Sequence, residues 1–413
     1  MDQLPSTHYH SPIVQQYNRE ARDRGLTIDL SLENLIATAH QETGLERFGD
    51  ESFRPALETF LQSAETEADL NPFGRLNARM RVLRSLKNRL WAEDCFAAAP
   101  EIRERKIEAP LIIVGPHRSG TTRLQHLLAT DTRFQHLTTW EGMNPAPRRA
   151  LPDQGRALRH EEVGTMLAGL EAAYPGASLA HPMKADWPEE EMLLLNHSFS
   201  GFAFIGAYHL PSYYRWFRDT DKEFAYRHMA DLMKLISWSR GTAGNKPWIL
   251  KNPQHMLDMD ILLRVFPDAR LVFTHRDPIK TVGSIMSLVW HFAVQHTDLP
   301  CRARTREVWM DFCEEMARRC MKVRESIPAD QQIDIHYEDM NRDWRGQMKR
   351  IYDFAGMEFT PAAEAAQTAW LADSKGRHGS HRYSLEDFGT SAAEVDERMM
   401  FVREKYGIPY EDR

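Results

Sequence analysis

The residues best suited to do chemistry form the loop GPHRSGTT, which runs from Gly115 to Thr122. The loop follows the short apolar run LIIV and precedes RLQHLLAT, whose apolar spacing predicts a helix. Such a loop turns backbone N–H groups inward, and the N-terminus of the following helix adds partial positive charge, so together they bind phosphate. An ordinary turn between a strand and a helix is the alternative.

The loop departs from the phosphate loop of kinases and nucleotide triphosphatases at one position. Its spacing fits G-x-x-x-x-G-K-[ST], but Thr121 stands where the lysine belongs. Kinases place that lysine on the β- and γ-phosphates and commonly use an acid for Mg²⁺, whereas the nearest loop cation here is Arg118. The loop therefore predicts phosphate binding without triphosphate chemistry.

A second candidate anion site follows the apolar run RLVFT. Arg276 comes just after this run, and Ser284 lies eight residues further along, in HRDPIKTVGS. If a helix begins at Asp277 or Pro278, Ser284 lies about two turns along it and faces the same ligand as Arg276. An arginine and a hydroxyl together can clamp a phosphate. An ion pair between Arg276 and Asp277, with a surface serine, is the alternative.

The elements that must position these residues are short apolar runs separated by helical patterns. We expect buried parallel strands at Leu111–Val114, Trp248–Leu250, Arg270–Thr274 and Ile333–Tyr337. Strands alternating with helices predict an α/β fold of the phosphate-loop type, a three-layer sandwich with a central parallel sheet, whose ligands bind at the carboxyl ends of the strands.

Two further regions have a distinctive composition. Residues 1–106 are predicted to form a helical N-terminal extension, and 107–413 the main domain with a helical, aromatic-rich insertion around 151–240. Within the extension, the stretch RLNARMRVLRSLKNRL carries six basic residues and no acid, which indicates a phosphate-binding helix, a membrane-surface helix or a solvated helix face. The aromatic side chains from Phe199 to Phe217 are either core or the wall of a pocket.

The loop RSGTT, combined with a later strand that ends in arginine and has a serine eight residues on, resembles the sulfotransferases that use 3′-phosphoadenosine-5′-phosphosulfate (PAPS). Further segments, TTWEGMNPAP, HPMKADWPEEE, WILKNPQH, IHYEDM and HRYSLEDFG, are similar to a large, mostly bacterial group of these enzymes, and the resemblance covers roughly 26–389. RSGTT, where the cytosolic phenol and steroid enzymes have KSGTT, also resembles the protein-tyrosine sulfotransferases.

The resemblance implies which residues bind the donor. The 5′-phosphosulfate would lie on the loop, with Arg118 replacing the usual lysine, and the 3′-phosphate on Arg276 and Ser284. The loop residues so implied are Arg118, Ser119, Gly120, Thr121 and Thr122. Lys375 and Arg377, in SKGRHGSHRYS, belong either to a basic loop over the nucleotide or to a basic loop without a ligand.

Sulfuryl transfer also needs a base for the acceptor and a cation near the transferred group. By resemblance to the protein-tyrosine enzymes Glu141 is the candidate base and Lys251 the cation. The alternatives are a helix N-terminal or surface carboxylate for Glu141 and a strand-end cation that points to water for Lys251. His136 and His181 are other candidate bases or acceptor contacts. Glu190 could contact the acceptor or belong to a solvated helix start, and His255 could orient a ligand or be structural.

Composition excludes several classes of protein. The net charge of −7 offers no general attraction for nucleic acid. No run of about 18 apolar residues could span a bilayer, and the first residues lack a signal-peptide pattern, so we expect a cytoplasmic protein. Four cysteines without a CxxC pair indicate no zinc, and sulfuryl transfer requires no metal.

The sequence thus predicts a PAPS-dependent sulfotransferase that acts on a hydroxyl, less readily an amine, of a small apolar or aromatic acceptor. The size and the family resemblance are compatible with a homodimer. A phosphate-loop kinase with an atypical loop and a non-catalytic nucleotide-binding module of the same fold are the two rival interpretations. The identity of the acceptor and the role of the basic stretch 75–90 are not specified by the sequence.

Overall fold

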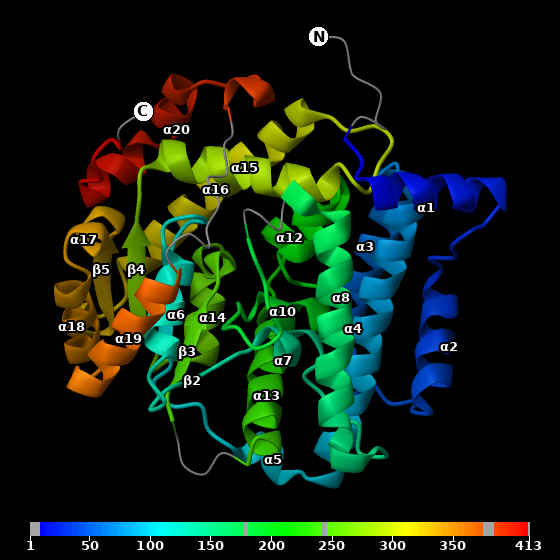
Figure 1. Ribbon diagram of the computed structural model, residues 1–413, viewed down its shortest axis with the longest axis horizontal. Helices are drawn as coiled ribbons and strands as arrows, with labels where there is room; N and C mark the ends of the chain where they lie inside the picture. Colours follow the sequence, from blue (N-terminus) through cyan, green and yellow to red (C-terminus); the bar gives the residue numbers. More distant parts are fainter. Residues whose placement is uncertain (1–8, 177–180, 242–245, 375–383, 412–413) are drawn as a thin grey trace.

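The structure is a computed structural model that describes residues 9–176, 181–241, 246–374 and 384–411 (Figure 1). Lys375 and Arg377 lie outside the described residues. The fold is a mixed α/β fold built around one parallel sheet, as the sequence predicted.

The sheet has five strands in the order β2-β3-β1-β4-β5, and every neighbouring pair is parallel. The strands are β1 (Leu111–Val114), β2 (Gln135–His136), β3 (Trp248–Lys251), β4 (Arg270–His275) and β5 (Gln332–His336). The four predicted strands are confirmed to within one residue at each end. The edge strand β2 was missed, since a pair of residues carries no periodic signal.

Each face of the sheet is covered by its own helices, which makes three layers. Side chains alternate between the faces of a strand, so Ile112 and Leu250 pack with α13, α14 and α16 while Ile113 and Ile249 pack with α6, α18 and α19. These helices are α6 (Thr121–Ala129), α13 (Glu223–Ser239), α14 (Met259–Val265), α16 (Arg302–Arg324), α18 (Trp344–Phe354) and α19 (Pro361–Ser374). Burial on both faces explains why the central strand β1 is entirely apolar, whereas the edge strand β5, with the sequence QIDIH, alternates polar and apolar residues.

The chain before β1 is helical. It comprises α1 (Pro12–Asp23), α2 (Leu32–Thr43), α3 (Arg54–Thr66), α4 (Pro72–Ala98) and α5 (Glu101–Glu104). The helices α1 to α4 lie on the far side of the molecule from β4 and β5, whereas α5 packs against α13 (Figure 1). Phe60 of α3 and Leu86 of α4 share one apolar core with residues beyond β1, such as Phe204 and Met286. The division into an extension at 1–106 and a main domain at 107–413 stays a prediction.

The segment between β2 and β3 is mostly helical. Besides α13 it contains α7 (Thr139–Met143), η2 (Pro152–Gly155), α8 (Arg156–Ala173), α10 (Met192–Leu195), η3 (Asn196–Ser198), α11 (Ala203–Ala207) and α12 (Pro211–Asp219). Most of its aromatic side chains are core, since Phe199, Phe204, Tyr213 and Phe217 are all buried in the cluster that also holds Phe60.

The remaining helices all come after β3 in the chain. They are η4 (Pro253–Met256), α15 (Pro278–Ala293), η5 (Ala329–Gln331), α17 (Tyr337–Arg342), η6 (Glu386–Phe388) and α20 (Ala392–Tyr406). The C-terminal α20 packs against α15 (Figure 1). Within the described ranges, no helix is both long enough and apolar enough to cross a membrane.

Candidate functional site

The loop between β1 and α6 is built to leave backbone N–H groups open. Gly120 precedes α6 with a left-handed φ of 88°, and no side chain caps the helix. The first N–H groups of a helix have no partner within it, and the helix dipole attracts an anion to them. Arg118 also has a positive φ, 67°, a strained conformation that proteins retain mainly at functional sites.

Contacts with Thr274 of β4 hold this loop in place. Ser119 Oγ lies 2.7 Å from Thr274 Oγ1 and donates to the Pro116 carbonyl, also at 2.7 Å. A Cβ on Gly115 would come within 2.0 Å of Thr274 Oγ1, so only glycine fits. Ser119 is buried and does not line the cavity described below, so the structure places it as an anchor of the loop.

Arg276 follows β4 and reaches the loop, which brings the two predicted anion sites together. Its Nη1 donates to the Arg118 carbonyl at 2.8 Å, and its guanidinium lies over the Tyr337 ring at 4.0 Å. Nε and Nη2 donate to the Glu411 carboxylate at 2.7 and 2.8 Å. Ser284 is buried on α15 and is not part of the cavity wall.

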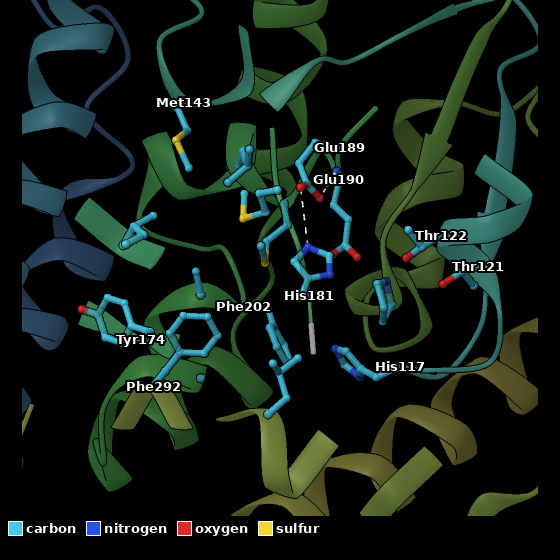
Figure 2. Close-up of a pocket in the computed structure, with 18 of the residues that line it drawn as sticks. His117, Thr121, Thr122, Met143, Tyr174, His181, Glu189, Glu190, Phe202 and Phe292 are labelled. Carbon is cyan, nitrogen blue, oxygen red and sulfur yellow. Dashed lines mark hydrogen bonds and ion pairs between the residues drawn. The ribbon is translucent and has the colours of Figure 1, made fainter. Parts of the chain in front are cut away.

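A cavity of about 1230 Å³ begins at this loop and extends to the N-terminal helices. Arg118, Thr121 and Thr122 line one end (the loop end), and side chains of α4 and α8 line the other (the α4 end). Figure 2 shows Thr121, Thr122 and His117 on one side and Met143, Tyr174 and Phe292 on the other. The volume exceeds the roughly 300–1,000 Å³ of a pocket for one small ligand, so two substrates can be held.

Lys251 lies at the junction of the two ends. Its ammonium is fully buried directly behind the cavity wall, where it forms an ion pair with Glu190 and lies 3.4 Å from Thr122 Oγ1. Both partners line the cavity. The solvated helix start that was the alternative for Glu190 is wrong, because Glu190 is bound to Lys251 while Glu189 and Glu191 are buried.

His181 and Glu189 face each other across the cavity wall between the two ends (Figure 2). His181 Nε2 lies 3.6 Å from Glu189 Oε2. Burial opposes ionisation of Glu189, but the positive charge of His181 in its protonated form, its hydrogen bond and the Lys251 ammonium outweigh burial and hold the pKa of this carboxyl well below its ordinary value. Glu189 is therefore ionised and can orient the imidazole of His181 as a proton acceptor.

His117 is a site residue that the sequence analysis missed, although it lies inside the phosphate loop. Its ring stacks on Phe202 with 4.5 Å between the centroids, and both residues line the cavity. Burial, with the nearby Lys251 and Arg118 cations, lowers the pKa of His117 to about 3, so the imidazole is neutral at pH 7. Its buried Nδ1 has no hydrogen-bond partner in the described part of the chain.

His255 is placed behind the site. It is completely buried, with Nε2 2.5 Å from Glu191 Oε1 and Nδ1 2.9 Å from the Tyr226 hydroxyl. The other oxygen of Glu191 accepts from the backbone N–H of Lys251 at 2.9 Å. His255 therefore contacts no cavity space and instead fixes the end of β3, from which Lys251 projects.

Glu141 and His136 also lie off the cavity wall. The Glu141 carboxylate forms an ion pair with Arg240 and caps its own helix through the hydroxyl and N–H of Thr138. Burial raises its pKa, but Arg240 and Thr138 outweigh that effect and the pKa lies below its ordinary value. His136 accepts a hydrogen bond at its carbonyl from Arg240, and burial lowers the pKa of its imidazole to about 4. Neither side chain is in position to take a proton from an acceptor in the cavity.

The described residues contain no group of three or more His, Cys, Asp or Glu side chains that could hold a metal ion. The cations near the loop end include Arg118, Arg276 and Lys251. The carboxylates of Glu411 and Glu190 pair with Arg276 and Lys251.

Comparisons with known proteins agree on one family. A model of the sulfotransferase family matches residues 110–361. Omega-hydroxy-beta-dihydromenaquinone-9 sulfotransferase Stf3, known from Mycobacterium bovis and Mycobacterium tuberculosis, is 25% identical over 329 residues, which cover 77% of this chain and 80% of that protein.

Two solved structures are similar over almost their whole length. Sulfotransferase STF9 from Mycobacterium avium superposes with a TM-score of 0.82 at 26% identity, covering 93% of this chain and 99% of that chain. Sulfotransferase STF1 from Mycobacterium tuberculosis H37Rv gives a TM-score of 0.76 at 29% identity, covering 90% and 99% of the two chains.

Proposed function

The chain belongs to the sulfotransferase family and is a sulfotransferase, and from this premise we propose that it transfers a sulfuryl group from PAPS to a hydroxyl of an apolar small molecule. The observation that carries the proposal is the single cavity that joins a phosphate-binding loop to an apolar wall, with Lys251, Glu190 and His181 at the junction. An amine acceptor is less favoured, because an aliphatic amine is protonated at pH 7 and must lose that proton before its nitrogen can attack, whereas a hydroxyl is neutral.

The loop end fits the donor in three ways. The uncapped N-terminus of α6 and Arg118 suit the 5′-phosphate, and Arg276 suits the 3′-phosphate. Trp344 and Trp370 line the same end and offer flat apolar surfaces for a purine. The loop needs no lysine for this donor, because PAPS has no β- or γ-phosphate for that lysine to bind.

The donor supplies the sulfuryl group and departs as adenosine 3′,5′-bisphosphate. Arg118 and the N–H groups of α6 stabilise the negative charge that grows on the departing 5′-phosphate. The Lys251 ammonium, held behind Thr122, stabilises charge on the oxygens of the transferred group. His181, oriented by Glu189, takes the proton of the acceptor hydroxyl as the new oxygen–sulfur bond forms and the bond to the phosphate breaks.

The acceptor binds along the rest of the cavity. Met143, Phe202 and Phe292 line it with apolar surface. The name of the mycobacterial relative gives an omega-hydroxy compound as its acceptor, which supports a hydroxyl here. A homodimer and a cytoplasmic location stay predictions.

The test is calorimetry of the full chain without added metal. We expect adenosine 3′,5′-bisphosphate to bind at micromolar concentration or tighter, and ATP and 5′-AMP to bind at least 10-fold more weakly, since only the bisphosphate has a group for Arg276. Arg276→Ala should remove this preference. Arg264→Ala, which removes an exposed guanidinium on α14, should leave it unchanged.

Each rival interpretation has its own outcome. A preference for ATP with Mg²⁺ would favour the kinase. Tight binding of the bisphosphate without its release from PAPS, for any hydroxyl acceptor, would favour the non-catalytic module.

A further inference from the structure

The six basic side chains of the stretch 75–90 on α4 fall into two groups. Four are bound to acids or carbonyl groups outside the cavity: Arg75 to Glu65, Arg79 to the Asp29 carbonyl and Asn34, Lys87 to Glu42, and Arg89 to the carbonyls of Asp50 and His197. The other two, Arg81 and Arg84, line the cavity. The basic stretch is therefore neither a solvated face nor a single binding surface.

Arg81 and Arg84 contact only neutral groups. Arg84 Nη1 lies 2.6 Å from the thioether sulfur of Met166 on α8, which is a weak acceptor. Arg81 Nε donates to Asn77 Oδ1 at 2.8 Å, an oxygen that also accepts from the Tyr208 hydroxyl at 2.6 Å. Across the described ranges, no ion pair joins either arginine to a carboxylate.

The acidic side chain that α8 contributes to the cavity wall is already bound to other residues. Glu162 lines the cavity, but its carboxylate is held by Arg148 and by Asn144. Burial, and next the neighbouring Arg81 cation, lower the pKa of Arg84 to about 10, which leaves it charged at pH 7. Two adjacent cations in an apolar wall are unfavourable unless an anion joins them.

The surroundings of the two arginines are apolar, and the cavity reaches the surface beside them. Leu76, Leu170 and Phe292 line this end. Ile13 of α1 and Met80 of α4 also line it and are 47% and 53% exposed. A long molecule can therefore lie between the loop end and α4, which are well separated in the fold (Figure 1).

We propose that the acceptor is an elongated apolar molecule with a hydroxyl at one end and an anionic group at the other, and that Arg81 and Arg84 bind the anionic group. The planar guanidinium forks suit a carboxylate or a phosphate, which each accept paired hydrogen bonds. The anion completes the charge balance that the protein leaves open at the α4 end. The hydroxyl then lies at His181 and Lys251, so this inference rests on the proposed function.

The test measures binding to the full chain loaded with adenosine 3′,5′-bisphosphate. The probes are omega-hydroxy fatty acids of several chain lengths, the matching omega-hydroxyalkyl phosphates and the methyl esters of the acids. We expect an acid or a phosphate of suitable length to bind about 10- to 100-fold more tightly than the ester, the range for hydrogen bonds to a charged group. The comparison of acid with phosphate identifies the anion.

The variant Arg84→Met keeps the length and apolar packing of the side chain but removes its charge. It should reduce anion binding to the level of the ester and leave the ester unchanged. Arg79→Met is the matched control, because Arg79 lies on the same helix but outside the cavity. Equal binding of anion and ester by the unmodified protein, or an anion preference that survives both Arg84→Met and Arg81→Met, would overturn the inference.

Failure of the proposed function has a different signature. If the bisphosphate does not bind, the donor assignment fails, whereas anion binding at α4 can still be measured on the unloaded protein. If the ester is sulfated as well as the acid, the proposed function stands and only the inference on the anionic group fails.

Discussion

The two ends of the cavity balance their charges in different ways. At the loop end the protein supplies the counterions, with Glu190 on Lys251 and Glu411 on Arg276. At the α4 end Arg81 and Arg84 contact an amide oxygen and a thioether. On the proposed assignments, the donor therefore meets a site whose Lys251 and Arg276 cations are already paired, whereas the acceptor site is completed by the anionic group of its ligand.

Substitutions of cations at the two ends should have different effects. At the loop end, removing a cation leaves a carboxylate without its partner, and that carboxylate repels the anionic donor. At the α4 end, removing a cation relieves repulsion between two arginines. Variants at the loop end should therefore affect transfer of the sulfuryl group to any acceptor, and variants at the α4 end only the choice of acceptor.

The largest effect is expected for Lys251→Ala. Loss of a cation that stabilises transition-state charge should reduce kcat about 10²- to 10³-fold. Affinity for an apolar acceptor should remain, because Lys251 lies behind the wall at the junction. Steady-state kinetics with one acceptor at varied concentration give both kcat and the KM for the acceptor.

The double variant Lys251→Ala/Glu190→Gln separates two causes of that loss. If Lys251 acts on the transferred group, kcat stays low in the double variant. Recovery of kcat would mean that the single variant suffers only from the unpaired Glu190 carboxylate.

The next largest effect is expected for His181→Ala. Removing the base should reduce kcat about 10²-fold with little change in the affinity for the bisphosphate, and added imidazole should restore part of the activity. His160→Ala is the control, since His160 is an exposed histidine paired with Asp186 at 3.0 Å. Full activity of His181→Ala would exclude His181 as the base and would make His117, the neutral imidazole inside the loop, the next candidate.

The two ends of the cavity also differ in how well they could be predicted from the sequence. The loop end could be predicted because its parts are local: a strand, a loop and a helix within about 20 residues, and an arginine directly after another strand. The α4 end is assembled from α1, α4, α8, α11 and α15, which are far apart in the chain. The spacing of basic residues on α4 could not show that Arg84 faces a cavity while Arg79 faces Asp29.

The partners of the acidic side chains were a second feature that the sequence could not predict. The acids of WPEEEM look alike in the sequence, but Glu189 binds His181 and Glu191 binds His255, partners that only the fold brings near. Glu141 is different, because Thr138 and Glu141 have the T-x-x-E spacing of a capping box. That spacing was present in the sequence and indicated a helix cap in place of a base.

Glu141→Gln should therefore affect stability and not activity. Breaking its buried ion pair with Arg240 should lower the free energy of unfolding by about 3 kcal/mol at pH 7, with kcat unchanged. The folded-state pKa of Glu141 is lowered, so this stabilisation is complete above the unfolded pKa of about 4.3 and is lost as the pH falls through the folded value. Urea unfolding between pH 7 and pH 3 should show the free energies of unfolding of the two proteins converging at acidic pH. A large loss of kcat in Glu141→Gln would instead indicate that Glu141 acts in catalysis.

The smallest effect is expected for Glu411→Gln, and its sign distinguishes a supporting counterion from a competitor. Glu411 accepts from Nε and Nη2 of Arg276, the guanidinium edge that suits paired hydrogen bonds to a phosphate. The pair is only partly buried, with 22% and 17% of the two side chains exposed, so it contributes about 0.5–1 kcal/mol. Because the donor must displace this carboxylate, the variant should bind adenosine 3′,5′-bisphosphate about 2- to 5-fold more tightly in calorimetry, while 5′-AMP, which lacks the 3′-phosphate, binds as before. Weaker binding of the bisphosphate would mean that Glu411 holds Arg276 in its binding position, and the loop end would then keep its counterion with the donor bound.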